Sequence, residues 1–395
     1  MQSQTTRRTH TTLPDDPNAA LLGRVWRPDV AGPAVIAVRA DGVFDISAQF
    51  PTSSLLAATA DPASVLRQAA GERIDDLEVL LGNTPPDTRD RARPWLLAPI
   101  DLQAIKAAGV TFAVSMLERV IEERARGNPD AAAAIRAEVD ALVGDDLSRL
   151  KPGSPEAMRL KEVLIAQNAW SQYLEVGIGP DAEIFTKAPV LSAVGTEMDA
   201  GLHPASVWNN PEPEVVVVVA PDGRIVGATL GNDVNLRDIE GRSALLLSKA
   251  KDNNASCAIG PFIRFFDGHF TLDHVRAMDV ALDVEGPDGF ALHGVSSLAR
   301  ISRDPAELVA QTINENHHYP DGFVLFLGTM FAPTKDRHAP GQGFTHVEGD
   351  RVTVATPKLG SLTNRMRPSH ACEPWTFGIG ALMSNLANRH LLRAP

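Results

Sequence analysis

Three acidic residues near the middle of the chain have the spacing of a metal site. Glu212 and Glu214 lie two positions apart beside a run of five valines, and Asp233 follows a turn sequence. Because side chains alternate along a strand, the two glutamates share a face. If the chain folds back about a centre between Asp222 and Gly223, Glu212 lies opposite Asp233 on that same face. One hairpin is therefore predicted to bring three carboxylates together.

Three neighbouring carboxylates repel one another unless a cation lies among them. An all-oxygen donor set suits a hard divalent cation, so we expect Mg²⁺, with Mn²⁺ or Ca²⁺ as alternatives, rather than Zn²⁺. The pattern alone leaves two other interpretations open. Glu-x-Glu beside prolines is also typical of a solvated strand end, and a register slip of one residue would turn Asp233 to the opposite face.

Two lysines, Lys249 and Lys251, follow downstream and are candidates for a base. A lysine beside a dication has its ammonium form disfavoured, so a neutral amine becomes available close to neutral pH. The pattern does not choose between the two lysines, and a surface position is the alternative for each. Cys257, which is followed by Ala-Ile-Gly-Pro, is expected to be a small buried residue rather than a nucleophile.

The segment 112–126 has the periodicity of an amphipathic helix, and it carries Glu118 and Glu122 one turn apart on one face. These glutamates are candidates for general acid–base catalysis. However, Ser115-Met-Leu-Glu118 also matches a capping box, which would make Glu118 structural. Further along, the apolar strand 322–327 ends in Gly328-Thr329, which could present an amide and a hydroxyl to a ligand.

Other patterns exclude several classes of chemistry. His317 and His318 are neighbours, and neighbours on a strand point to opposite faces, so a core or rim role is expected for each rather than a metal pair. The sequence contains no Gly-x-Gly-x-x-Gly motif, Walker loop or Gly-x-Ser-x-Gly elbow. Nucleotide binding and serine-hydrolase chemistry therefore have no support.

Composition indicates a globular protein. The chain has 395 residues, of which 44% are apolar and 22% charged, and its net charge of −12 argues against nucleic acid as a partner. Two cysteines cannot form a disulfide framework, which favours a reducing cytoplasm. The longest apolar run, Val215 to Ala220, is too short for a membrane span, and the N-terminal residues do not resemble a secretory signal.

The elements suggest two domains after a disordered tail at 1–18. Residues 19–98 are predicted to form a small α+β domain, and residues 99–395 a catalytic domain. The catalytic domain begins with a helical segment at about 112–174 and becomes β-rich from Ile184 onward.

Local signals place several elements within these domains. Asp41-Gly42 predicts a hairpin between apolar strands, and Asp61-Pro predicts a helix start. Prolines 85, 86 and 94 predict a linker that few contacts cross. Asn128-Pro-Asp opens an Ala-rich segment, and Ser154-Pro-Glu opens a helix from Ala157 to Leu174.

From about residue 100 to its end, the sequence resembles the fumarylacetoacetate hydrolase family. The resemblance rests on Glu212-Pro-Glu214, Gly231-Asn-Asp233, Lys251, Cys257-Ala-Ile-Gly-Pro261, Gly328-Thr329, and the stretch from Gly349-Asp350 to Asn364. It implies an α+β fold with a mixed β-roll or β-sandwich catalytic domain, here with a helical insertion. It also implies that the two glutamates and the aspartate bind Mg²⁺ or Ca²⁺ and that Lys251 lies beside the substrate. Substrate binding is assigned to Thr329, Arg119 and Gly260.

One departure from the family pattern narrows the range of reactions to be expected. Hydrolytic members carry an early histidine that helps a glutamate to activate water, whereas residues 109–122 contain none. This region is more similar to the family's sugar-acid branch, the 2-keto-3-deoxy-pentonate dehydratases. The resemblance therefore implies metal-dependent dehydration of 2-keto-3-deoxy-D-pentonate to 2-oxoglutarate semialdehyde. In this scheme Lys251 removes a C3 proton and Glu118 or Glu122 protonates the departing C4 hydroxyl.

Three alternatives to dehydration follow from the same residues. The first is hydrolysis of a 2,4-diketo acid, which gives pyruvate or a related keto acid. The second is decarboxylation or tautomerisation of an oxaloacetate-like acid. The third is a non-catalytic, metal-stabilised scaffold. In every enzymatic case the expected partner is a small 2-keto acid, and the resemblance implies a homodimer or homotetramer.

Overall fold

The computed structural model describes residues 10–126, 128, 150–166, 170–330, 335–338 and 343–392. The Ala-rich segment after Asn128 lies outside the described residues as far as residue 149. Of the predicted tail, residues 10–18 are described, and they contact later parts of the chain through the pairs His10–Asp283 and Asp16–Arg264. Among the described helices, none is both long and apolar enough to cross a membrane.

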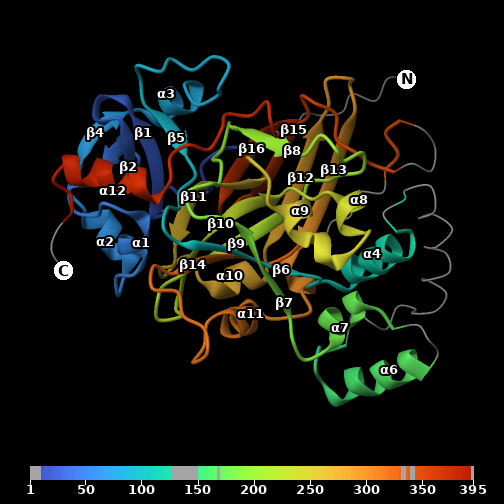
Figure 1. The fold of residues 1–395 in the computed structure, drawn as a ribbon. Helices are drawn as coiled ribbons and strands as arrows, with labels where there is room; N and C mark the ends of the chain where they lie inside the picture. The colour runs from blue at the N-terminus through green and yellow to red at the C-terminus, as the bar shows by residue number, and fades with distance from the viewer. Residues whose placement is uncertain are drawn as a thin grey trace.

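A large mixed sheet runs through the molecule (Figure 1). Within the described residues it has eleven strands, and only the β14–β6 pair is parallel. Its strands, in spatial order, are β4 (Glu72–Asp75), β3 (Gly42–Asp45), β2 (Gly32–Arg39), β1 (Leu21–Arg27), β11 (Cys257–Phe265), β10 (Ile225–Asp233), β9 (Pro213–Val219), β14 (Phe323–Phe326), β6 (Ala104–Gly109) and β7 (Glu183–Ala188), with β5 (Trp95–Leu97) paired to β1.

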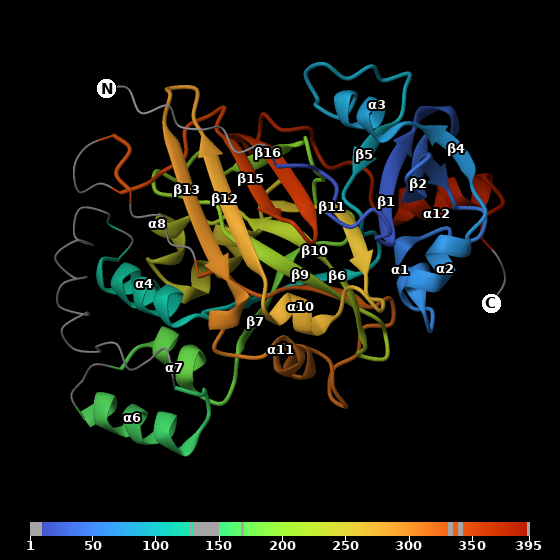
Figure 2. The ribbon, with the colours of Figure 1, turned by 180° about the vertical axis from the view of Figure 1, so that it is seen from behind.

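A second, smaller mixed sheet lies over the middle of the first (Figure 2). Its five strands among the described residues are, in order, β13 (Ala291–Ser297), β12 (Asp279–Glu285), β15 (Arg351–Thr356), β16 (Gly360–Pro368) and β8 (Asp199–Leu202). The two mixed sheets and their helices agree with the predicted α+β class. The assignment to a roll or a sandwich stays a prediction.

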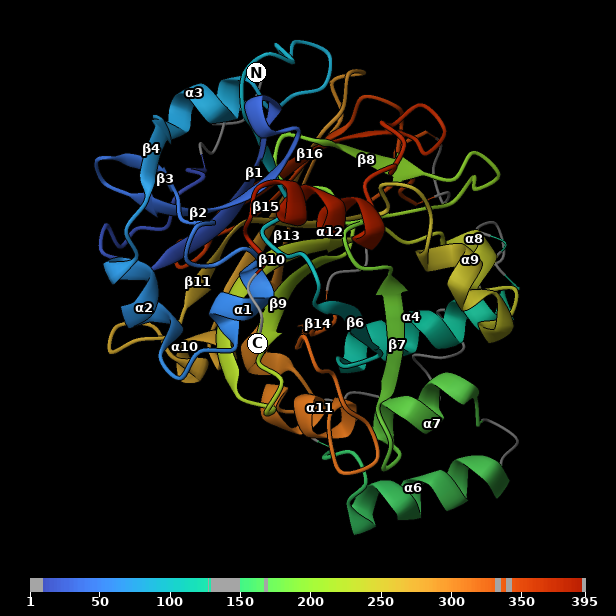
Figure 3. The same cartoon turned by 60° about the vertical axis from the view of Figure 1, so that its left-hand side comes forward.

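Helices flank both ends of the large sheet (Figure 3). In Figures 1 and 3, α4, α8 and α9 gather at one end. Figure 1 shows α12 across the N-terminal strands at the other end. The described helices are α1 (Ser53–Ala57), α2 (Pro62–Gln68), α3 (Leu77–Gly82), α4 (Ala113–Arg124), α6 (Pro155–Ala166), α7 (Gln172–Ile178), α8 (Arg237–Glu240), α9 (Leu247–Lys251), α10 (Leu272–Arg276), α11 (Pro305–Thr312) and α12 (Ile379–Asn388), with 3-10 turns η1 (Pro28–Val30), η3 (Ala244–Leu246) and η4 (Leu298–Arg300).

The valine run of β9 is buried on both faces, as predicted. Val215, Val217 and Val219 share a hydrophobic core with residues of β12, β15 and β16. Val216 and Val218 share another with residues of α1, α2 and β2. β-branched side chains pack well on both faces of a buried strand, so this strand is fixed from two sides.

The turn between β9 and β10 differs from the prediction, although the pairing beyond it does not. Ile225 pairs with Val219, which centres the turn on Asp222 rather than between Asp222 and Gly223. Gly227 then pairs with Val218, so Val226 has no partner and forms a β-bulge. An extra residue on one strand shifts the register by one, and this shift restores the predicted pairing.

The restored register places the acidic residues as predicted. Gly231 pairs with Glu214, and the backbone N–H of Asp233 donates to the carbonyl of Glu212 at 3.0 Å. A slip of one residue, which would separate Asp233 from the two glutamates, is therefore excluded.

The helical segment matches the prediction at its beginning but not at its end. Helix α4 buries Val120 and Ile121 on one face, as the predicted amphipathic helix requires. The helix expected from Ala157 to Leu174 is interrupted, because Ser171 is the N-cap of α7 and its hydroxyl accepts from the Leu174 N–H. A serine that caps a new helix breaks the old one. Residues 167–169, between the two helices, lie outside the described set.

The N-terminal segment is part of the same sheet as the later chain. Strands β2 and β3 form the predicted Asp-Gly hairpin, and Asp61 caps α2 by accepting from the Ser64 N–H. Strand β1 pairs with β11, so the segment 19–98 continues the large sheet. The predicted linker makes more contacts than expected, because Arg89 forms an ion pair with Glu373. The division into two domains stays a prediction.

Gly231 is required by close packing at the end of the hairpin. A Cβ added there would overlap the ring of Phe326 and approach Val216. Overpacking a well-filled core typically costs about 1–3 kcal/mol. We expect Gly231→Ala to lower the free energy of unfolding by about that amount in urea denaturation. Gly268→Ala, at a glycine with no atoms nearby, is the control and should change stability by less than about 0.5 kcal/mol. Equal effects of the two substitutions would contradict this packing argument.

Candidate metal centre and active site

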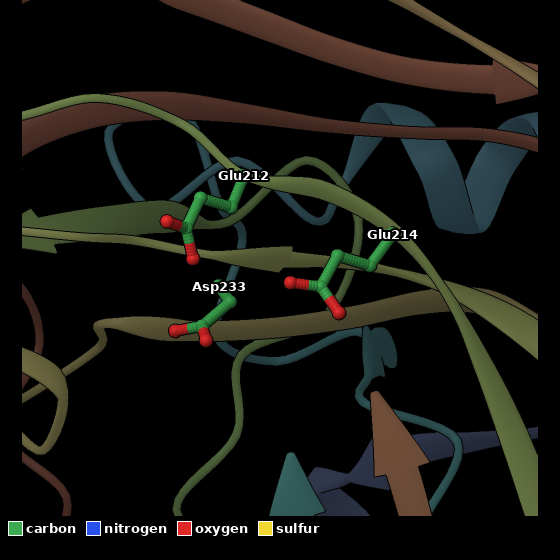
Figure 4. A group of neighbouring side chains, drawn as sticks. All are labelled: Glu212, Glu214 and Asp233. Atoms are coloured by element: carbon green, nitrogen blue, oxygen red, sulfur yellow. The ribbon is translucent and has the colours of Figure 1, made fainter. Parts of the chain in front are cut away.

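Glu212, Glu214 and Asp233 converge at the end of the β9–β10 hairpin. Figure 4 shows their carboxylates turned to the same side of the strands. One oxygen from each lies within 4.8 Å of the others, and the three residues are only 6%, 3% and 2% exposed. A solvated strand end is therefore excluded, because these charges are removed from water.

Three cationic side chains offset part of this negative charge. Lys251 Nζ lies 2.5 Å from Glu212 Oε2 and 3.0 Å from Asp233 Oδ2. Lys187 Nζ lies 2.7 Å from Asp233 Oδ1, and Arg119 Nη2 lies 2.6 Å from Glu212 Oε1. Buried charges are tolerated only when they are paired in this way.

A β-bulge brings Lys187 to the site. Ile105 of β6 pairs with Ala188, and the next residue of β6 pairs with Thr186, so Lys187 is the extra residue on β7. A bulge can turn a side chain away from its regular direction. The Lys187 ammonium is fully buried and also donates to the backbone carbonyls of Val234 and Lys251.

Glu214 differs from the other two carboxylates, since it forms no ion pair within the described part of the chain. Its Oε2 accepts a hydrogen bond of 2.6 Å from the Gly328 N–H. Burial, and then the charges of Asp233 and Glu212, raise the pKa of Glu214 well above its ordinary value. A divalent cation would supply the compensating charge that the protein does not, so the donor set fits a hard dication. Glu212, Glu214 and Asp233 are the residues that would hold it.

A comparison with protein families agrees with this site. Residues 171–367 match the model described as fumarylacetoacetate (FAA) hydrolase C-terminal. These residues belong to the fumarylacetoacetate hydrolase family. The family segment contains the three carboxylates together with Lys187 and Lys251, whereas α4 with Arg119 precedes it.

Curated relatives of the chain are named as sugar-acid dehydratases. One is the 2-dehydro-3-deoxy-D-arabinonate dehydratase of Saccharolobus solfataricus, 29% identical over 179 residues, which are 44% of this chain and 58% of the relative. Another is a probable 2-keto-3-deoxyxylonate dehydratase of Haloferax volcanii, 29% identical over 192 residues, which are 49% of this chain and 62% of the relative. The chain thus spans less than two thirds of the length of either relative.

Solved structures share the fold over most of the chain. A 2-keto-3-deoxy-D-arabinonate dehydratase in its apo form superposes with a TM-score of 0.61 at 20% identity, covering 88% of this chain and 99% of the other. A structure of 2-keto-3-deoxy-D-arabinonate dehydratase complexed with magnesium and 2,5-dioxopentanoate superposes with a TM-score of 0.60. It covers the same percentages of the two chains. The mixed fold is therefore that of dehydratases of the fumarylacetoacetate hydrolase type.

The structure distinguishes the two candidate lysines of the family segment. Lys251 is buried against the carboxylates and lines a pocket that they also line, whereas Lys249 is exposed. The predicted neutral state of Lys251 does not hold with the protein's charges alone. Burial favours the neutral amine, but Asp233, Glu212 and Glu240 outweigh burial and raise the pKa of Lys251 above its ordinary value.

The capping-box interpretation of Glu118 is wrong. Helix α4 begins at Ala113 with Phe112 as its N-cap, and the Ser115 hydroxyl donates to the Phe112 carbonyl instead of capping. Glu118 is therefore not held by a cap, and its Oε2 accepts from Arg237 Nη2 at 3.2 Å.

Glu122 is poorly suited to donate a proton. Its oxygens pair with Arg119 Nη1 at 2.7 Å and Arg237 Nε at 2.6 Å. Burial acts to raise the pKa of Glu122, but the two guanidiniums outweigh burial and lower it. An ionised carboxylate clamped in this way is an anchor for the two arginines rather than an acid.

Two further carboxyl groups, Glu183 and Glu240, line the pocket and were not found from the sequence. Burial is the main cause that raises the pKa of both, that of Glu240 to about 7. Glu183 lies opposite Gly109, where a Cβ would overlap its carboxyl group. A glycine paired with an acidic residue indicates that space is kept for the carboxyl group. The sequence alone does not reveal this, because the pairing of β6 with β7 must be known first.

The predicted ligand-binding residues divide into two groups. Thr329 and Arg119 line the pocket. The Gly328 amide is already donated to Glu214, so it is not presented to a ligand as expected. Gly260 does not line the pocket, because a Cβ there would face Leu362 and Thr196 in the core. His317 and His318 are exposed, consistent with a rim role.

Binding of Mg²⁺ is expected to release protons. The pKa of Glu214 is raised, and a metal ligand must be deprotonated, so affinity is full at high pH and falls as the pH is lowered. The Kd for Mg²⁺ should rise by up to about tenfold per pH unit for each proton released. Calorimetric titration in two buffers of different ionisation enthalpy measures this release directly. Identical enthalpies in both buffers, with a Kd independent of pH, would contradict it.

Proposed function

We propose that the protein catalyses the Mg²⁺-dependent dehydration of 2-keto-3-deoxy-D-pentonate to 2-oxoglutarate semialdehyde. The observation that carries the proposal is one buried pocket that contains three metal-type carboxylates, Lys251 and a carboxyl group with a raised pKa, that of Glu183. The names of both curated relatives support it, as does the structural relative complexed with magnesium and 2,5-dioxopentanoate, another name for the semialdehyde.

The pocket residues can be assigned to the two proton transfers of a dehydration. A divalent cation on the carboxylates would supply the Lewis acidity that makes the C3 protons of a 2-keto acid removable. Lys251 lies at the wall beside Glu212 and Asp233. After its ammonium leaves these carboxylates and gives a proton to solvent, the neutral amine takes the C3 proton. Glu183, whose raised pKa favours the protonated carboxyl, gives its proton to the C4 hydroxyl, which leaves as water. Tautomerisation of the dehydrated acid then yields the semialdehyde.

Hydrolysis of a 2,4-diketo acid is not favoured. That reaction needs a water molecule activated by a general base, and the expected histidine is missing from residues 109–122. Among the described residues, no histidine lines the pocket of the carboxylates. The pocket therefore offers proton transfer to and from the substrate, but not the histidine–glutamate pair of the hydrolytic members.

The two neighbouring lysines provide a matched test of the proposed reaction. In a coupled assay with a semialdehyde dehydrogenase, Lys251→Met should lower kcat by about 10²–10⁴-fold, because the base is lost. Lys249→Met, two residues away and exposed, should retain near wild-type turnover.

Two outcomes would contradict the proposal. Retention of turnover by Lys251→Met to within about tenfold of wild type would remove Lys251 from the reaction. Formation of pyruvate instead of the semialdehyde by the wild-type enzyme would show carbon–carbon cleavage.

A further inference from the structure

A second small pocket adjoins the pocket of the metal-type carboxylates. Ser115, Arg119, Glu212 and Thr329 line both pockets, so the two meet along a shared wall. A short acid whose keto-carboxylate end lies at the carboxylate triad would have its distal end within reach of this second pocket.

The charged groups of the second pocket are already engaged with one another. Arg119 pairs with Glu122 at 2.7 Å and with Glu240 at 2.8 Å. Arg237 pairs with Glu122 at 2.6 Å and with Glu118 at 3.2 Å. Arg119 also pairs with Glu212 at 2.6 Å. Each guanidinium thus faces at least two protein carboxylates, so neither has a positive charge left over for a second anionic group of a ligand.

The remaining polar groups of the second pocket are neutral. Ser115, Asn210 and Thr329 contribute hydroxyl and carboxamide groups to its wall. Ser115 donates its proton to the Phe112 carbonyl at 2.9 Å, which leaves its oxygen able to accept. Carboxylate oxygens and neutral acceptors together suit a ligand group that donates hydrogen bonds and carries no charge.

We propose that this pocket selects 2-keto acids with a neutral, hydroxylated distal end and rejects dicarboxylates. The proposal rests on the proposed function only in placing the keto-carboxylate end at the triad. A hydroxyl group can donate to Glu118 and accept from the neutral groups. A distal carboxylate would instead lie beside Glu118 and Glu122 with no unshared cation, and like charges in such proximity cost several kcal/mol in binding.

Glu118 is the residue that decides this selection. It is the most exposed carboxylate of this pocket, with 12% of its side chain accessible, and its 3.2 Å contact with Arg237 is the longest of these ion pairs. Replacing it by glutamine removes one negative charge and leaves Arg237 with charge to share. It lies on α4, which precedes the segment matched to the family, so the selecting group is supplied from outside that segment.

Two unreactive ligands isolate the contribution of the distal end. 5-Hydroxy-2-oxopentanoate and 2-oxoglutarate have the same length and the same keto-carboxylate end, and neither has a C4 hydroxyl to lose. Calorimetry would give the Kd of each, and of pyruvate, for the Mg²⁺-loaded wild type, Glu118→Gln and Glu123→Gln. Glu123 is the matched control, because it lies on the same helix and bonds Gln172 at the surface. The Kd for Mg²⁺ is measured for every variant.

Wild type and the Glu123→Gln control are expected to bind the hydroxy acid at least about tenfold more tightly than 2-oxoglutarate. Glu118→Gln should reduce that ratio by about tenfold, chiefly through tighter binding of 2-oxoglutarate. Equal affinities in wild type, or a ratio that Glu118→Gln leaves unchanged, would overturn the selection while pyruvate binding keeps the proposed function intact. Absence of Mg²⁺-dependent pyruvate binding would overturn both.

Discussion

Repulsion among three buried carboxylates is the constraint that the surrounding structure must satisfy. At an effective dielectric constant of about 20, two unit charges about 4 Å apart repel by about 4 kcal/mol. The hairpin holds Glu212, Glu214 and Asp233 within that range and away from water. Lys187 from β7 and Lys251 from α9 approach Asp233 from two elements, and α4 contributes a guanidinium. Since none of these cations reaches Glu214, the site keeps a negative charge that a dication can balance.

Rigidity of the hairpin makes this concentration of charge possible. The valines of β9 fill cores on both faces of the large sheet, one shared with the smaller sheet and one with the N-terminal helices. The N-terminal segment thus supports the site without lining its pocket. The cations, in contrast, come from short or irregular elements: Lys251 ends a five-residue helix, and Lys187 lies at a bulge. A cation at the end of a short helix can move more easily than a carboxylate on a buried strand, which suits a lysine that must leave its ion pairs to act as a base.

The part of this arrangement that is local in the chain was predictable. The valine run and the turn after it predicted a buried hairpin and the pairing of Glu212 with Asp233, although the bulge at Val226, which restores the register, left no signal. The sequence did not reveal the groups that reach the site through pairing of strands far apart in the chain. Lys187 arrives by an irregularity between β6 and β7, and the raised pKa of Glu183 depends on burial that only the folded chain creates. The capping-box prediction for α4 was wrong because the N-cap is Phe112, three residues before the predicted Ser115.

The central claim is that the carboxylate triad binds a hard dication in place of its lysine contacts. Anomalous diffraction from crystals soaked with Mn²⁺ tests it most directly. We expect one anomalous peak at about 2.0–2.6 Å from an oxygen of each of Glu212, Glu214 and Asp233, with Lys251 Nζ moved away from Glu212. A triad without a peak, with Lys251 still bonded to Glu212 at a saturating Mn²⁺ concentration, would contradict the account.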